Sequence, residues 1–280
     1  LDPIFIFIFK MGVEGAAIAT IIGQAVSGIV SLYYLKKFKT IQLNKESIKI
    51  NFRTLKSLIA LGISSFITQI SITLVIIVSN QLMAKYGAVS KYGSDIPLSA
   101  FGIVMKVNQI INSIILGIAI GAQPILGFNY GAKKYERVKQ TYVRAISLGF
   151  IITTLGTLIL QLCPQLIINL FGQENDLYNE YAKMCFRRFL MLIIFNSFQI
   201  TTGIFMQAIG KSIKSAAISL SRQILFLLPA MLIWSMLGGV EGILFSGPTA
   251  DGLAFLMAVT LVTFEFKKIK KLQAQIEKTQ

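Results

Sequence analysis

Residues 145–170 read AISLGFIITTLGTLILQLCPQLIINL, 26 residues without a charged side chain. A helix of about 20 apolar residues crosses the hydrocarbon core of a bilayer. Comparable apolar runs recur along the chain, in which hydrophobic residues make up 54% of the 280 positions and charged residues only 14%. Soluble domains contain about 25% charged residues. The sequence therefore predicts an all-α polytopic membrane protein whose main solvent is a lipid bilayer.

Eight apolar stretches separated by polar breaks define the candidate membrane spans. They are 1–9, 16–35, 57–84, 98–122, 145–170, 186–208, 215–237 and 247–265. The first stretch begins Leu1-Asp2-Pro3 and has neither an initiator Met nor a basic segment before it, so it does not read as a signal peptide. We interpret it as the end of a helix that is followed by seven full transmembrane helices.

Basic residues are distributed unevenly between two alternating sets of loops. One set holds 19 basic and 4 acidic residues, and the other holds 4 basic and 7 acidic residues. The basic set comprises 36–56, 133–144, 211–214 and 265–280, and the acidic set comprises 10–15, 85–97, 171–183 and 236–251. Because positively charged loops face the cytoplasm, we predict a multi-pass protein of the cell membrane with a cytoplasmic C-terminus. This distribution accounts for the net charge of +15, so nucleic acid is not predicted as a partner.

A four-residue motif occurs twice in the chain. Gly12-Val13-Glu14-Gly15 recurs 227 residues later as Gly239-Val240-Glu241-Gly242. An even number of predicted helices separates the copies, which indicates a parallel duplication into two six-helix lobes. The predicted domains are the end of an N-terminal lobe (1–36), a cytoplasmic linker (37–56), a complete C-terminal lobe (57–266) and a basic cytoplasmic tail (267–280). The rest of the N-terminal lobe is then expected as a missing partner of the same polypeptide.

Polar side chains inside three predicted helices fall on one face of each helix, at helical spacing. The candidates on these faces are Gln69, Thr73, Lys106, Gln109, Asn196 and Gln199. Polar groups without partners are costly in hydrocarbon, so these faces should avoid lipid. Two interpretations stay open: the side chains hydrogen-bond neighbouring helices, or they line a wet cavity. Three such faces together favour a cavity that forms a substrate or ion pathway.

Few charged side chains lie within the predicted spans. Lys106 follows Pro97 by nine residues, about 14 Å along a helix, which places it near mid-membrane, where an ionisable residue marks a functional site by default. Arg222 is expected closer to the cytoplasmic surface and Asp251 near the outer surface, and both are further candidates for the pathway. No carboxylate is expected clearly at mid-depth. The carboxylate that a proton- or sodium-coupled carrier usually needs should therefore lie in missing helices, unless Asp251 is deeper than its position indicates.

The residue inventory argues against enzymatic chemistry. The sequence contains no histidine, and its two cysteines, Cys163 and Cys185, fit no metal-ligand spacing. Histidine-based hydrolases and zinc-protease helices are therefore excluded, and neither a metal nor a cofactor is predicted. Gly127–Arg137 reads as a tight cytoplasmic connection without phosphate-cradling spacing. Any transport is accordingly expected to be driven by an ion gradient.

Residues 117–143, GIAIGAQPILGFNYGAKKYERVKQTYV, closely resemble the hallmark of multidrug and toxic compound extrusion (MATE) transporters. Further matches follow in order: LDPIFIF (1–7), GVEGAAIAT (12–20), FMQAIGKS (205–212), SRQILFLLP (221–229) and PTADGLAF (248–255). The resemblance is nearest to the bacterial drug-exporting branch. It implies a MATE-like bundle of two six-helix lobes around a central cleft, and antiport of organic cations against H⁺ or Na⁺ by alternating access. The best-known proton-linked aspartate of the family lies in the first helix of the N-terminal lobe, outside this sequence.

Three alternatives stay open. A relative with the same architecture could flip lipid-linked sugars or export polysaccharide, because the cargo cannot be read from one lobe. A membrane-embedded enzyme would need a convergent nucleophile, base or metal set, for which the chain offers few groups. The chain could also be a non-functional fragment.

Overall fold

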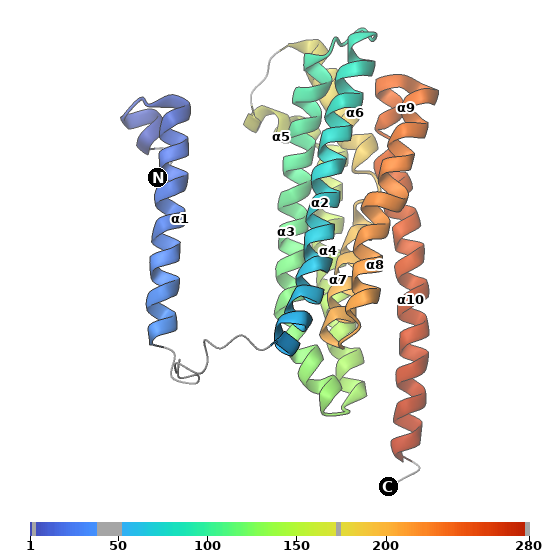
Figure 1. The fold of residues 1–280 in the computed structure, drawn as a ribbon. Coiled ribbons are helices and arrows are strands. Elements are labelled where there is room, and N and C mark those ends of the chain that lie inside the picture. Colours follow the sequence, from blue (N-terminus) through green and yellow to red (C-terminus); the bar gives the residue numbers. More distant parts are fainter. Residues whose placement is uncertain (2–3, 38–51, 172–174, 278–280) are drawn as a thin grey trace. The chain divides into compact units, whose positions relative to one another are not determined.

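A computed structural model describes residues 1, 4–37, 52–171 and 175–277, and every regular element in these ranges is helical (Figure 1). The chain divides into two compact units, Leu1–Ser57 and Leu58–Gln280. Residues 38–51, most of the predicted linker, lie outside the described ranges. The predicted domain boundaries themselves remain a prediction.

The first unit contains a short π-helix, η1 (Ile4–Ile8), one long helix, α1 (Gly12–Lys36), and residues 52–57, which begin the next helix. Between η1 and α1 the chain turns sharply through Lys10 and Gly12, both with positive φ. Gly15 lies so close to the turn that an added Cβ would approach the carbonyl oxygen of Phe5 to 3.0 Å. The first predicted stretch is thus a short helical segment, and the second is the full helix α1.

The second unit is a bundle of long helices with several breaks (Figure 1). Its elements are α2 (Phe52–Ala88), α3 (Asp95–Gly131), α4 (Tyr135–Leu162), α5 (Pro164–Phe171), α6 (Asp176–Phe189), α7 (Ile194–Ala208), α8 (Ser212–Leu220), η3 (Ser221–Leu227), α9 (Leu228–Ile243) and α10 (Ser246–Glu277). In the described part of the chain six helical segments are long and apolar enough to cross a bilayer. The bent pair α6 and α7 makes a seventh if it counts as one span, which agrees with the seven predicted full helices.

Several helix boundaries differ from the predicted spans. The stretch 145–170 is not one helix, because α4 ends at Leu162 and Pro164, which cannot donate a helical hydrogen bond, begins α5. The axes of α6 and α7 differ by 50° across their break. Helix α3 continues to Gly131, so the connection predicted at Gly127–Arg137 is only the three-residue turn 132–134. Helix α10 continues to Glu277, so most of the predicted tail is helical.

The turn between the last two spans begins near the start of the connection predicted at 236–251. The helical path reverses at Gly239, whose φ of 59° and ψ of −142° suit glycine. The returning segment runs beside the rising one: Trp234 Nε1 donates to Thr249 Oγ1 at 3.1 Å, and a Cβ on Gly242 would lie 2.1 Å from the Trp234 carbonyl oxygen. Asp251 follows Thr249 by two residues and therefore belongs to the returning segment.

Two apolar clusters fill the second unit. The first includes Met83, Phe101, Tyr181, Phe189 and Met231, and the second includes Leu126, Tyr142, Phe205, Ile218 and Ile269. Along α3, α7, η3 and α10 a polar segment separates residues of the first cluster from residues of the second. We call these side chains the polar layer: Asn108, Asn112, Asn196, Gln199, Arg222 and Asp251. The layer crosses the interior of the bundle between two apolar regions.

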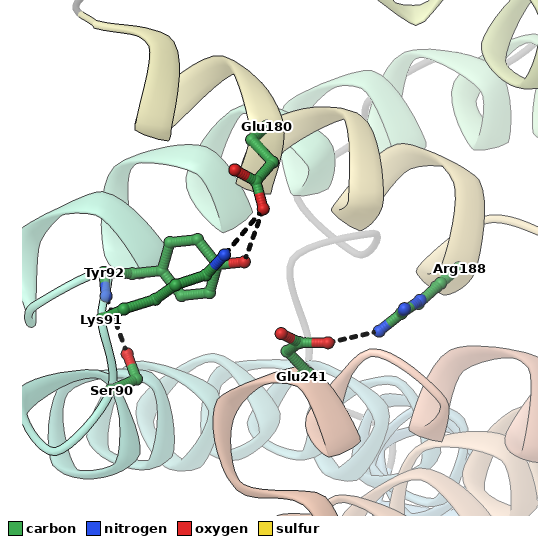
Figure 2. A network of polar contacts seen from close by, with 6 residues as sticks. All are labelled: Ser90, Lys91, Tyr92, Glu180, Arg188 and Glu241. Atoms are coloured by element: carbon green, nitrogen blue, oxygen red, sulfur yellow. Dashed lines mark hydrogen bonds and ion pairs between the residues drawn. The ribbon is translucent and has the colours of Figure 1, made fainter.

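Ion pairs at one end of the bundle join loops to helices (Figure 2). Lys91, in the α2–α3 loop, donates to Glu180 Oε1 of α6 at 2.8 Å, and the Tyr92 hydroxyl contacts the same oxygen at 3.3 Å. The hydrogen bond with Glu180 raises the pKa of Lys91. Arg188 of α6 pairs with Glu241 of α9 at 2.8 Å. These contacts stabilise the end that the charge pattern predicts to face outward.

Candidate functional site

The structure divides the eight predicted site residues into two groups. Gln69 and Thr73 on α2, and Lys106 and Gln109 on α3, are exposed on the surface of the unit. The other four are buried: Asn196 and Gln199 on α7, Arg222 on η3 and Asp251 on α10. The polar faces read from helical spacing therefore have two different environments.

The exposed residues of α3 line a cavity of about 640 Å³. Its walls are Lys106, Gln109, Ile110, Ser113, Ile114 and Phe171. Within the described residues Lys106 has no ion-pair partner. Gln69 and Thr73 are exposed on α2 but do not line this cavity. We refer to Lys106, Gln109 and Ser113 as the α3 face.

Hydroxyl groups along the exposed faces are satisfied by their own helices. Ser113 Oγ donates to the Gln109 carbonyl oxygen at 2.8 Å, and Thr73 Oγ1 donates to the Gln69 carbonyl oxygen at 3.1 Å. The amides of Gln69 and Gln109 and the ammonium of Lys106 are left as the groups that can contact another molecule. An ammonium and an amide offer hydrogen-bond donors, and the amide oxygen offers an acceptor.

Asparagines connect α3 and α7 inside the polar layer. Asn196 Nδ2 donates to Asn112 Oδ1 at 2.7 Å, and Asn112 Nδ2 donates to Asn108 Oδ1 at 3.0 Å. Asn196 is 3% exposed. Its amide thus hydrogen-bonds a neighbouring helix, which is the packing interpretation of this polar face, and its part in a pathway stays a prediction.

Gln199 connects α7 to α8. Its Nε2 donates to the Ile218 carbonyl oxygen at 2.9 Å, and this oxygen also accepts from Ser221 Oγ at 2.9 Å. The Gln199 Oε1 atom is buried and has no hydrogen-bond partner in the described part of the chain. Buried acceptors are usually paired, so this oxygen is an exception that asks for an explanation.

Arg222 and Asp251 form an ion pair within the bundle. Both Nε and Nη2 of Arg222 lie 2.7 Å from Asp251 Oδ1. The Asp251 residue is 3% exposed, and the Arg222 residue is 8% exposed. Arg222 was expected closer to the cytoplasmic surface and Asp251 near the outer surface, but the two side chains are in contact, so at least one of them lies at another depth than expected. Asp251 is a carboxylate in the interior of the bundle.

A second buried carboxylate was not predicted from the sequence. Glu265 of α10 is 1% exposed and pairs with Lys211 and with Lys214, the latter at 2.9 Å. Glu265 lies between Phe264 and Phe266 in the sequence and shares its end of the bundle with many lysines. An acidic residue in such surroundings was the available signal. The contacts join the α7–α8 connection to α10 at the end predicted to be cytoplasmic.

No group of three potential metal ligands is present among the described residues. The polar layer instead offers amides, hydroxyls and one ion pair. Such an arrangement can hold protons, water or helix contacts, but it contains no nucleophile with an adjacent base.

Comparison with known proteins extends these observations. A family model described as MatE matches residues 65–232. A multidrug export protein, MepA, from Staphylococcus aureus strain MSSA476 is 24% identical over 265 residues, which are 94% of this chain and 56% of that protein. The same protein from Staphylococcus haemolyticus strain JCSC1435 is 24% identical over 264 residues.

Solved structures show the same fold. A MATE family multidrug resistance transporter in an outward-facing conformation matches with a TM-score of 0.82 and 21% identity, over 97% of this chain and 60% of that one. A MOP superfamily transporter from Pyrococcus furiosus matches with a TM-score of 0.81 and 20% identity. The chain thus spans 56% to 60% of the length of these relatives. Together with its apolar helices, the matches identify a multi-pass membrane protein.

Proposed function

Because the chain belongs to the MatE family, we propose that it is the C-terminal part of a multidrug efflux transporter. The proposed cargo is a small organic cation, exported by alternating access in exchange for H⁺ or Na⁺ across the cell membrane. The observation that carries the proposal is the α3 face, an exposed polar surface with a cavity of about 640 Å³ on a membrane helix. A polar surface that faces lipid is costly, so this one is better explained by contact with water and cargo.

The proposal includes a second lobe of the same polypeptide. The relatives named above are longer than this chain. The α3 face would form only one side of a cleft. A cleft needs a second wall, which the missing N-terminal lobe would supply. We therefore expect residues 1–280 expressed alone to insert into the membrane without exporting a cationic dye, unless two copies associate to replace the second lobe.

Lys106 is expected to act on the second lobe rather than on the cargo. Two like charges 4 Å apart repel by about 4 kcal/mol at an effective dielectric constant of 20. A cationic cargo would therefore avoid the Lys106 ammonium. A carboxylate of the second lobe is a better partner, and protonation of that carboxylate would release the pair and let the lobes rearrange.

Dye efflux against an imposed proton gradient tests this role in the two-lobe transporter. Lys106→Ala should reduce coupled export more than Lys106→Arg, because arginine retains the charge although its geometry differs. Lys139→Ala, at an exposed lysine near the start of α4, is the matched control and should export at the parental rate. If Lys106→Ala exports at the parental rate with the parental pH dependence, the pairing proposal fails.

A flippase of lipid-linked sugars, or an exporter of polysaccharide, is the second candidate. The amides of Gln69 and Gln109 favour it, because uncharged donors and acceptors suit sugar hydroxyls. Competition for thiol labelling of a cysteine introduced at Gln109 distinguishes the two. Slower labelling in the presence of an organic cation supports drug export, whereas protection by a lipid-linked oligosaccharide alone supports the flippase.

A further inference from the structure

Stability alone does not explain the Arg222–Asp251 pair. Moving two charges out of water costs free energy that their attraction often fails to recover, and well-packed apolar side chains commonly replace such a pair without loss. Here the two charges lie between apolar clusters of a membrane bundle. Well-packed apolar side chains at these two positions should stabilise the fold equally well.

An alternative acceptor for Arg222 is present one helical turn away. Gln199 Nε2 is bound to the carbonyl oxygen of Ile218, which precedes Arg222 by four residues. This hydrogen bond fixes the orientation of the amide and leaves Gln199 Oε1 buried without a partner. A guanidinium carries five N–H donors and no acceptor. Gln199 Oε1 is therefore a group that Arg222 could satisfy.

The backbone that carries Arg222 is not a regular α-helix. Arg222 is the second residue of the π-helix η3, which interrupts the path from α8 to α9. π-helical segments are rare, poorly favoured and frequent at functional sites. The Ile218 carbonyl oxygen at the start of this segment accepts two side-chain donors, from Gln199 and Ser221. Arg222 therefore lies in an irregular backbone segment whose first turn also accepts hydrogen bonds from side chains.

Other charges near α10 are already paired or distant. From the elements packed against α10, η3 contributes Arg222, and α7 carries no charged residue. Glu241 of α9 pairs with Arg188 of α6, and Lys214 of α8 pairs with Glu265, fourteen residues along α10 from Asp251. The charged residues of α4 lie in its first ten residues. On α6, Glu180 pairs with Lys91, and Asp176, Lys183 and Arg187 line a second cavity beside this pair. Among the described residues, Arg222 is therefore the charged group that acts directly on the Asp251 carboxylate.

We propose that Arg222 is a two-position switch, bound to Asp251 when that carboxylate is ionised and to Gln199 Oε1 when Asp251 has taken up a proton. In this step an O–H bond forms on Asp251, which becomes a neutral acid, while Arg222 keeps its charge because arginine is not deprotonated in proteins. The proton comes from water and returns to it. Release of Asp251 removes the ion pair between η3 and α10, and the new contact joins Arg222 of η3 to Gln199 of α7. The switch rests on the proposed function in one respect, namely that proton uptake serves transport.

A proton fits this site better than a metal cation. Hard cations need several oxygen ligands at once, and the described residues present one carboxylate here. A proton needs a single oxygen. Asp251 is accordingly a proton site, and Gln199 is a positioning residue that accepts the displaced guanidinium.

Infrared difference spectroscopy on the whole chain in lipid tests the switch without any transport assay. Acidification should produce a carboxylic acid C=O band that is absent in Asp251→Asn. In Gln199→Leu the midpoint of this band should move to lower pH by about one unit, a tenfold higher proton concentration, because the displaced Arg222 then lacks a partner. Gln207→Leu, an exposed amide further along the same helix, is the matched control and should keep the parental midpoint.

Each outcome decides the proposal. If no Asp251-dependent acid band forms while the protein stays folded, or if Gln199→Leu and Gln207→Leu share one midpoint, the switch is refuted. If Gln199→Leu fails to fold, Gln199→Asn, whose side chain is one methylene shorter, must show the same downward shift. Replacing choline by sodium at constant pH should leave the band unchanged, and its loss would overturn the assignment to a proton. Absence of dye export by the two-lobe transporter, with an intact Asp251 band, would refute the proposed function and leave the switch standing.

Discussion

Lys106 and Arg222 are both cations within membrane-spanning helices, yet their surroundings are opposite. Lys106 is exposed on the α3 face beside a cavity and has no ion-pair partner among the described residues. Arg222 is enclosed in the polar layer and held by Asp251 at 2.7 Å. A free charge on a surface can respond to a molecule that arrives, whereas a paired charge in the interior responds only when its partner changes. The difference indicates that Lys106 belongs to a surface that contacts other molecules, whereas Arg222 acts inside the bundle.

The buried pair should show the largest effect on stability when one partner is removed. Asp251→Leu leaves the Arg222 charge uncompensated, which typically costs about 3–5 kcal/mol. The double variant Arg222→Met with Asp251→Leu should regain most of that loss because no buried charge remains. Thermal unfolding of the purified chain in detergent measures both. Equal melting temperatures for the single and double variants would show that the pair is not the cause.

Glu265 should show an intermediate effect. Glu265→Gln removes the negative charge that holds Lys211 and Lys214, but both lysines are partly exposed and can be hydrated. We expect a loss of about 2 kcal/mol, the contribution of hydrogen bonds to a charged group. The same unfolding measurement applies, with Glu136→Gln on the exposed start of α4 as the control. A change no larger than that of the control would contradict a stabilising role for the contacts of Glu265 with Lys211 and Lys214.

Lys106 should show the smallest effect on stability. Its side chain lies on the surface without an ion-pair partner, and substitutions at such positions usually change the free energy of unfolding by less than about 0.5 kcal/mol. Lys106→Ala should therefore unfold at the parental temperature even though it impairs export. A melting temperature lowered as far as that of Asp251→Leu would place Lys106 in a structural contact and remove the contrast with Arg222.

The sequence predicted the helices well because a membrane span is decided by length and hydrophobicity, which are local. Seven full spans were read in this way, and the structure has six, or seven with the bent pair. The breaks were missed where one residue changes the path. Pro164 begins a new helix inside an unbroken apolar run, and the predicted span 186–208 is divided into the bent pair α6 and α7.

The candidate site was only partly readable, since helical spacing gives a face but not the neighbour that covers it. Gln109 and Asn196 follow the same pattern, yet one is exposed and the other hydrogen-bonds Asn112. Asp251 was placed near the surface because its depth depends on the turn at Gly239. Glu265 was overlooked because its burial depends on Lys211 and Lys214, which lie more than fifty residues earlier in the chain.

Cysteine accessibility of the α3 face in the membrane-embedded two-lobe transporter tests the central claim most directly. In a background with Cys163 and Cys185 replaced, Gln109→Cys should react with a small charged thiol reagent, and a transported cationic dye should slow the reaction. Leu155→Cys, which is equally on the surface but on the apolar side of α4, should stay unmodified because lipid covers it. If Gln109→Cys is as unreactive as Leu155→Cys, the α3 face meets lipid or protein rather than water, and the proposed pathway is wrong.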